Sequence, residues 1–157
     1  MSQLQTYFEI CQLHAAYSAA VDSNDWERWI DLFTDDCEYK VQPRENHERG
    51  FPLSTLALLS KGMLRDRAYG IRETLFHDPY YQRHVVGQPL IVSDDGELIV
   101  TETNYTVFRT KLSQETTVFN AGRYLDRIRR TAGGLRLASR LCIYDTEMIP
   151  NSLIYPI

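Results

Sequence analysis

The sequence predicts an α+β fold in which two N-terminal helices precede a meander of long strands. Apolar residues recur at helical spacing along the segment up to Phe33. After Pro79 the chain is enriched in Thr, Val, Ile, Tyr and Phe and is interrupted by turn sequences, which favours antiparallel strands. Helices followed by strands indicate α+β rather than alternating α/β architecture. With 157 residues, we expect one domain spanning residues 1–157.

The first expected helix begins at Ser2, whose side chain can cap a helix N-terminus. A series of apolar residues then follows at spacings of three and four, and this series is expected to form the buried stripe: Leu4, Phe8, Cys11, Ala15 and Ala19.

The second expected helix follows Asn24, which is placed to act as its N-cap. Asp25 and Glu27 suit the positive end of a helix. Its apolar residues share one face: Trp26, Trp29, Ile30 and Phe33. At this spacing the two tryptophans favour a core role over a cofactor or base-stacking role.

The middle of the sequence predicts a strand, an exposed loop and a helix. Asp36–Val41 alternates like a short strand. Pro43–Gly50 is polar and reads as an exposed loop of the kind that often carries contacts to partners. A short apolar stretch, Leu53–Leu59, precedes a helix expected from Lys61 to about Glu73.

Four strand segments are expected in the second half: Gln82–Val92, Glu97–Thr110, Thr116–Arg129 and Leu135–Tyr144. Asp95-Gly96 and Gly133-Gly134 supply the positive φ angles that tight hairpins require. A long curved sheet, antiparallel or mixed, packed against N-terminal helices resembles the cone of nuclear-transport-factor-like (cystatin-like) proteins.

Composition excludes several classes of partner. The net charge of −4 argues against a global attraction to nucleic acid or to an anionic membrane. No run reaches the ~18 apolar residues of a membrane span, and Met1–Asn24 lacks the basic start of a signal peptide. Cys11, Cys37 and Cys142 are odd in number and widely spaced, which favours reduced thiols. We therefore expect a cytoplasmic protein.

No motif for a metal or a nucleotide is found. A Rieske cluster needs Cys-x-His or Cys-x-x-His pairs, and no His follows a Cys at that spacing. His77, Asp78 and His84 leave a non-haem iron site unsupported though not excluded. P-loop, dinucleotide-binding and nucleophile-elbow motifs are absent. We expect no catalytic, cofactor-binding or metal-ligating residue in this chain.

One basic concentration lies across the last expected hairpin, with Arg on both strand faces: Arg123, Arg127, Arg129, Arg130, Arg136 and Arg140. A nucleic-acid groove would need these charges unopposed and interleaved with stacking rings. An ion-pairing surface or a subunit interface, where Arg is enriched, is the preferred interpretation.

A pocket inside the cone is the enzymatic alternative. Tyr17 and Asp22 near the end of the first helix, Tyr39 on the first strand and His84 on a later strand could converge there. A Tyr hydroxyl can polarise a carbonyl while His or Asp moves a proton, as in a free-standing dehydratase or isomerase. The competing and preferred interpretation is structural: core rings with satisfied hydroxyls and a helix-ending Asp.

Three segments carry a resemblance to a known family. Tyr17 to Tyr39 contains Tyr, then Asp, then Asp-Trp-Glu-x-Trp, then Leu-Phe-x-x-Asp-Cys-x-Tyr. Tyr80–Val86 is a strand-like segment that contains Arg-His. The C-terminal part contains the third segment, from Phe119–Tyr124 through Leu141–Thr146. In this order, across nearly the whole chain, these segments resemble the small (β) subunits of Rieske-type aromatic-ring-hydroxylating oxygenases.

Within that family, Pro43–Asn46 and the tail Glu147–Ile157 are most similar to salicylate 5-hydroxylase small subunits, with anthranilate-type enzymes next. The resemblance implies a non-catalytic subunit that trimerises and supports three large (α) subunits as an α3β3 hexamer. It implies that the α chain holds a 2Fe-2S Rieske cluster and a mononuclear Fe(II). Electrons would come from NAD(P)H through a reductase and a ferredoxin, and O2 would hydroxylate the ring.

Three regions are candidates for subunit contacts: the loop Arg44–Pro52, the segment His77–His84 and the apolar tail from Ile149. An apolar tail exposed to solvent would be a liability. Its burial against its own domain and its burial at an interface are left as equal alternatives.

Overall fold

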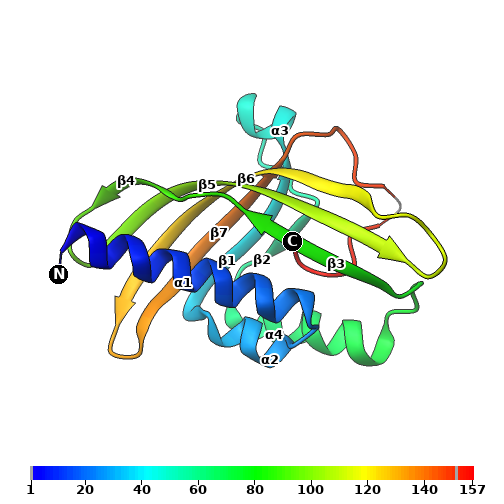
Figure 1. Cartoon of the computed structure of the whole chain (residues 1–157), viewed down its shortest axis with the longest axis horizontal. Helices are drawn as coiled ribbons and strands as arrows, with labels where there is room; N and C mark the ends of the chain where they lie inside the picture. Colours follow the sequence, from blue (N-terminus) through cyan, green and yellow to red (C-terminus); the bar gives the residue numbers. More distant parts are fainter. Residues whose placement is uncertain (1, 151) are drawn as a thin grey trace.

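The computed structural model describes residues 2–150 and 152–157, so Met1 and Asn151, the latter part of the predicted tail contact, lie outside the described residues. The chain forms one long curved sheet with helices packed along one side (Figure 1). The helices are α1 (Gln3–Asp22), α2 (Trp26–Asp31), α3 (Arg44–Glu48) and α4 (Lys61–Tyr69), the last continued by a π-helical turn over Gly70–Thr74. Over the described residues, no helix is both long enough and apolar enough to cross a membrane.

The strands are β1 (Phe33–Pro43), β2 (Leu56–Leu58), β3 (Tyr80–Val86), β4 (Leu90–Asp94), β5 (Leu98–Lys111), β6 (Thr117–Thr131) and β7 (Gly134–Tyr144). Their order is β2-β1-β7-β6-β5-β3, and β4 also pairs with β5. All pairs are antiparallel except β1 with β7, which is parallel. The predicted α+β class with N-terminal helices on a curved mixed sheet is confirmed.

The helix α1 begins where Ser2 was expected to cap it, because the Ser2 side chain accepts from the Gln5 amide at 3.2 Å. The predicted buried stripe is wrong: Leu4 is 79% exposed and Phe8 is 55% exposed. The helix instead packs through a second set at the same spacing: Thr6, Ile10, Leu13, His14, Tyr17, Ala20 and Val21. Thr6 and His14 in this set are polar, so the buried face is not continuous in apolar residues. A search for apolar residues at helical spacing therefore selects the wrong face.

The helix α2 is capped by Asp25 rather than by Asn24. The Asp25 carboxylate accepts from the Arg28 amide at 3.1 Å, while Asn24 takes a left-handed conformation at φ 57° between the two helices. Trp29 packs edge-on against Trp26 and Phe33, with ring centroids 6.2 and 5.6 Å away. The predicted core role of this aromatic face is therefore confirmed.

Two predicted segments differ from the structure. The expected loop at Pro43–Gly50 contains the short helix α3, which is stabilised by ion pairs one turn apart, Arg44–Glu48 and Glu45–Arg49, both at 2.9 Å. The expected strand Gln82–Val92 is divided into β3 and β4, because Pro89 has no amide hydrogen for a strand ladder. Both pieces pair with β5.

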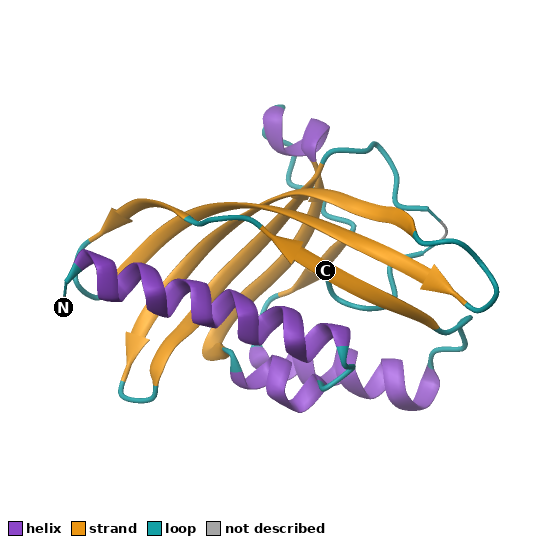
Figure 2. Cartoon of the chain, viewed as in Figure 1, coloured by secondary structure: helices purple, strands orange, loops and turns teal. Residues whose placement is uncertain are grey.

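The two faces of the sheet differ in what covers them. Along β5, Ile99, Thr101, Thr103, Tyr105 and Val107 are buried and point toward the helices. The alternating residues, Val100, Glu102, Asn104 and Thr106, point to the opposite face. In Figure 2 the helices α1, α2 and α4 lie on one side, and only the short α3 stands at the far end of the sheet.

Gly122 on β6 marks the closest approach of two strands. It lies opposite Tyr144 of β7, and a Cβ added there would overlap the main-chain oxygen of Ile143. A main-chain oxygen inside a ladder cannot move aside as a flexible side chain would. Only glycine fits this position.

Replacing Gly122 with Ala is therefore expected to destabilise the fold by about 1–3 kcal/mol, the usual cost of overpacking a core. The measurement is the free energy of unfolding in urea. The matched control is Gly62→Ala in α4, where the new Cβ would meet only the Ser60 hydroxyl at 3.5 Å. That control is expected to be neutral or slightly stabilising. Equal stability of the two variants would contradict the prediction.

Candidate functional site

The structure brings the four predicted pocket residues together between α1 and the sheet. Tyr17 on α1 and Tyr39 on β1 both donate their hydroxyls to the main-chain oxygen of Ile157, at 2.7 and 2.9 Å. Asp22 and His84 lie beside them, and the rings of Tyr17 and His84 are 6.3 Å apart. The convergence that the alternative requires is therefore present.

The Asp22–His84 pair ties the end of α1 to β3. The Asp22 carboxylate accepts from Nδ1 of His84 at 2.6 Å and from the His84 amide at 3.0 Å. The His84 side chain is fully buried. A carboxylate that takes both a side-chain and a main-chain donor from one residue fixes the position of a strand relative to a helix.

The space next to the hydroxyls of Tyr17 and Tyr39 is filled by the chain itself. After β7 the chain returns to the middle of the molecule (Figure 1), and Ile157 is 0% exposed between Tyr17, Tyr39 and Cys142. Burial raises the pKa of Tyr17 and of Tyr39 well above the ordinary tyrosine value. These hydroxyls serve as neutral hydrogen-bond donors to the tail, and a substrate has no access to them while the tail is in place.

The centre of the interior is an ion pair that sequence reasoning missed. Arg140 on β7 donates to both carboxylate oxygens of Asp126 on β6, at 2.9 and 2.7 Å. The guanidinium lies between two tyrosine rings, 4.1 Å from the centroid of Tyr17 and 3.9 Å from that of Tyr124. Each member of the ion pair is 1% exposed. The alternation of inward and outward residues along β7 could have revealed it. Arg140 is an even number of residues from the buried Cys142 and Tyr144, so it points to the same face of the sheet.

Three groups of this centre influence one another's protonation. Burial alone would raise the pKa of Asp126, but the charge and hydrogen bonds of Arg140 hold that pKa below its usual value. The His14 imidazole lies 3.4 Å from the Asp126 carboxylate. Burial lowers the pKa of His14, and the contact with Asp126 opposes this only in part. The chain therefore holds His14 in its neutral form over a wider pH range than water would.

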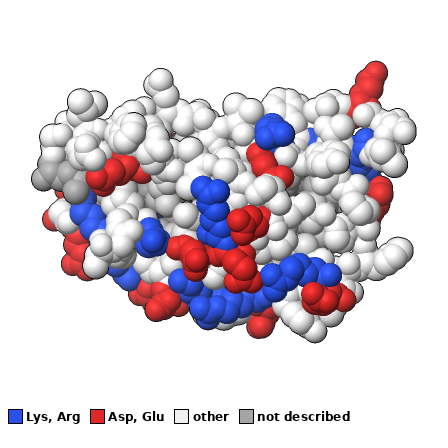
Figure 3. Space-filling model, turned by 60° about the horizontal axis from the view of Figure 1, so that its bottom comes forward, with Lys and Arg blue, Asp and Glu red and all other residues white. Residues whose placement is uncertain are grey.

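Three of the five remaining predicted arginines form ion pairs, in agreement with the preferred interpretation of an ion-pairing surface. Arg123 pairs with Glu102 at 3.0 Å, Arg129 with Asp36 at 2.9 Å, and Arg130 with Asp94 at 2.7 Å. In Figure 3 basic and acidic side chains alternate over the face shown rather than gathering into a patch of one sign. This arrangement is unlike a nucleic-acid groove.

The residues considered for iron do not meet. His77 contacts the hydroxyl of Tyr155 at 2.9 Å, Asp78 pairs with Lys111 at 2.7 Å, and His84 is held by Asp22. Over residues 2–150 and 152–157, no three His, Cys, Asp or Glu side chains are grouped as metal ligands. The three cysteines are free thiols.

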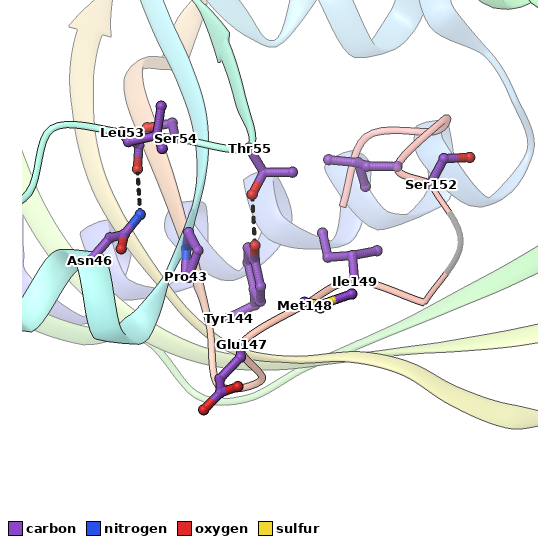
Figure 4. A pocket seen from close by; sticks show the side chains of 11 residues that line it. Pro43, Asn46, Leu53, Ser54, Thr55, Tyr144, Glu147, Met148, Ile149 and Ser152 are labelled. Carbon is purple, nitrogen blue, oxygen red and sulfur yellow. Dashed lines mark hydrogen bonds between the residues drawn. The ribbon is translucent and has the colours of Figure 1, made fainter.

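A surface hollow of about 370 Å³ lies between the segment before β2 and the tail (Figure 4). Thr55 and Tyr144 join their hydroxyls across it at 2.6 Å, and Asn46 donates to the Leu53 oxygen at 3.0 Å. Among the side chains that line it, Glu147 alone carries a charge. A single acidic group offers no partner for acid–base chemistry, so this hollow has no catalytic constellation.

Comparison with known proteins identifies close relatives. A family model described as a SnoaL-like domain matches residues 2–141. The small subunit of anthranilate 1,2-dioxygenase from Burkholderia cepacia is 37% identical over 155 residues, which cover 98% of this chain and 96% of that protein. A β subunit of the terminal oxygenase component of terephthalate 1,2-dioxygenase from Comamonas is 34% identical, covering 95% and 97% of the two chains.

A solved structure agrees with these relatives. The crystal structure of a β subunit assigned to an aromatic-ring-hydroxylating dioxygenase of Novosphingobium aromaticivorans is 38% identical to this chain. It superposes with a TM-score of 0.90 over 98% of both chains. Sequence and structure therefore agree on the same group of proteins along nearly the full length.

The lowered pKa of His14 predicts how stability changes with pH. Below about pH 6.5 the unfolded chain binds a proton at His14 that the folded chain resists, so stability falls as the pH decreases toward the folded pKa. One such group contributes a slope of up to about 1.4 kcal/mol per pH unit. We expect His14→Gln to lose this part of the slope, measured as the free energy of unfolding in urea from pH 5 to 8.

The matched control is His47→Gln on the short surface helix α3, which is expected to keep the pH dependence of the original chain. A slope below pH 6.5 that His14→Gln leaves unchanged would contradict the assignment of this titration to the interior.

Proposed function

This chain belongs to the small subunits of aromatic-ring-hydroxylating dioxygenases, and from that premise we propose that it is the structural small subunit of a terminal oxygenase component. The observation that carries the proposal is the near full-length match to such subunits in sequence and in structure. Membership of a multi-subunit oxygenase implies a large oxygenase subunit as partner. We place the assembly in the cytoplasm.

We assign the redox centres to that partner. The described residues of this chain do not offer the Cys and His groupings that a Rieske cluster or a mononuclear Fe(II) requires. The large subunit would hold both centres, and NAD(P)H would supply electrons through a reductase and a ferredoxin. In a monohydroxylation, a ring C–H becomes C–OH, the second oxygen atom of O2 leaves as water, and NAD(P)H supplies two electrons.

The small subunit would then act as a rigid base of an α3β3 hexamer in which three copies of this chain associate. Its interior is suited to rigidity. The Asp22–His84 pair connects α1 to β3. Arg140 pairs with Asp126 across β6 and β7 and packs on the Tyr17 ring of α1. A fixed geometry between large subunits matters if electrons pass from the Rieske centre of one to the iron of the next.

Exposed rings support two of the three predicted contact regions. Phe51 lies in the loop Arg44–Pro52 and Tyr81 in the segment His77–His84, and both rings are half or more exposed. Phe76, which is also exposed, lies just before the second segment. Aromatic rings are enriched at subunit interfaces. The third region, the tail, packs against its own domain, which is one of the two alternatives for it.

For the ring substrate we propose a benzoate-type acid, with salicylate and hydroxylation at its position 5 as the specific case. The names of the relatives point to rings that carry a carboxylate, anthranilate and terephthalate. The segment Pro43–Asn46 and the tail favour the salicylate group within the family.

The free-standing dehydratase or isomerase is not favoured. Its residues converge, but the hydroxyls of Tyr17 and Tyr39 are engaged by Ile157 and His84 by Asp22. Both tyrosine hydroxyls and Nδ1 of His84 therefore have structural partners, while Nε2 of His84 has none among the described residues.

The main test is co-expression of this chain with a Rieske-type large subunit, followed by measurement of assembly mass, iron content and hydroxylation of salicylate and anthranilate. We expect iron and activity only in the mixed hexamer, and faster turnover of salicylate. Asp22→Asn is expected to lower stability while keeping turnover per hexamer. Failure to associate with any such large subunit would contradict the proposal, as would turnover by this chain alone.

The contact regions predict a selective effect on assembly. Tyr81→Ser in β3 should lower the fraction of hexamer, because it removes a ring that is 80% exposed in a predicted contact region. The matched control is Leu4→Ser on α1, 79% exposed and outside these regions, which should leave the hexamer intact. Both should change the stability of the isolated chain by less than about 0.5 kcal/mol. Analytical ultracentrifugation measures the assembly, and equal behaviour of the two variants would refute the assignment.

A further inference from the structure

The last segment of the chain is bound as a ligand is bound. We propose that the cone interior is a binding site for a carbonyl-type oxygen carried on a short apolar body, and that the segment Leu153–Ile157 occupies this site. Small branched or aromatic acids and amides are the molecules that it would accept in place of the tail. This inference does not rest on the proposed function.

The main chain of the tail is held by side chains of the domain rather than by strand pairing. Nη2 of Arg67 donates to the oxygens of Leu153 and Ile154 at 2.6 and 2.8 Å. Nε2 of Gln82 donates to the Pro156 oxygen at 3.3 Å. None of the described strands includes this segment. The tail is therefore held as a separate segment, by side-chain donors of the surrounding domain.

The innermost oxygen lies between two hydroxyl donors. The Ile157 oxygen accepts from Tyr17 and Tyr39, and the Ile157 amide donates back to the Tyr39 hydroxyl at 2.9 Å. The Cys142 thiol lies 3.4 Å from the same oxygen. Two converging donors from different elements define a site for one acceptor atom.

Two apolar recesses hold the side chains of the tail. The Tyr155 ring packs against Tyr80 and Trp26, with centroids 4.6 and 5.6 Å away. Ile157 is fully buried. The deep recess thus fits a branched aliphatic group next to the oxygen site.

The two tyrosine hydroxyls would lose their acceptor if the tail left, whereas Gln82 would keep its contact with the Val21 oxygen. With the tail in place, Tyr17 and Tyr39 are each 0% exposed, so the tail oxygen takes the position that water would otherwise occupy. A buried donor without a partner costs free energy. The two converging hydroxyls therefore favour a ligand that carries an oxygen acceptor.

The test compares the full chain with a chain that ends at Ser152. The probes are isovalerate, isovaleramide and the peptide Leu-Ile-Tyr-Pro-Ile. We expect the shortened chain to have a lower Tm that rises with each probe, and calorimetry to give weak binding to it. The full chain should show neither effect. Comparison of acid with amide tells whether the site prefers a charged or a neutral oxygen.

Tyr39→Phe in the shortened chain removes one of the two hydroxyl donors. It should weaken the binding of each probe about tenfold. Tyr69→Phe, at an exposed position of α4, is the matched control and should leave binding unchanged. If the shortened chain is unfolded alone, Tyr155→Gly combined with Ile157→Gly in the full-length chain replaces it.

A folded variant that binds neither peptide nor small acid overturns the proposal. So does a chain that stays unfolded in every variant with the peptide present, because the tail would then be an integral part of the core rather than an occupant of a site.

Discussion

The buried pair of Asp126 and Arg140 is the interaction on which the rest of the interior depends. The two residues lie directly opposite each other on β6 and β7, so the pair forms as soon as these strands are in register. Tyr17 covers the guanidinium from α1, and Tyr124 covers it from the sheet. Removing one member of such a pair costs about 3–5 kcal/mol, because a buried charge loses its partner. The position of α1 on the sheet follows from this pair.

Around that centre, several polar groups that could perform chemistry have structural partners. Asp22 and His84 connect a helix to a strand, and the hydroxyls of Tyr17 and Tyr39 hold the tail. Beside these two hydroxyls the interior is filled by Ile157. This use of the interior agrees with membership in a family of small subunits whose partners are large oxygenase subunits.

Most strands, and the aromatic face of α2, were predictable because their signals are local. Alternation marks β5, β6 and β7, and Gly96 and Gly134 take the positive φ angles that their hairpins need. The buried stripe of α1 was not predictable from apolar spacing, because His14 belongs to it through a distant partner on β6.

The candidate site was predictable only in part. The sequence identifies Tyr17, Asp22, Tyr39 and His84 as a set, since each has chemistry and a place on an inward face. It does not reveal that their partners include Ile157, which is separated from Tyr17 by most of the chain. Arg140 resembles the surface arginines in sequence because it is charged, although its position two residues before Cys142 places it on the same buried face of β7. Long-range pairing of polar groups has no local signature in a single sequence.

The parallel pairing of β1 with β7 constrains the order in which the molecule can be built. Phe33–Pro43 finds its central neighbour only in Gly134–Tyr144, and the other neighbour, β2, is three residues long. During synthesis the first strand therefore emerges long before its partner exists. Its aromatic residues lack this neighbour until Gly134–Tyr144 has been synthesised. Contacts so distant in sequence slow folding and leave a nascent chain exposed to aggregation. A cell that makes this protein must hold β1 without its central neighbour until β7 has been synthesised.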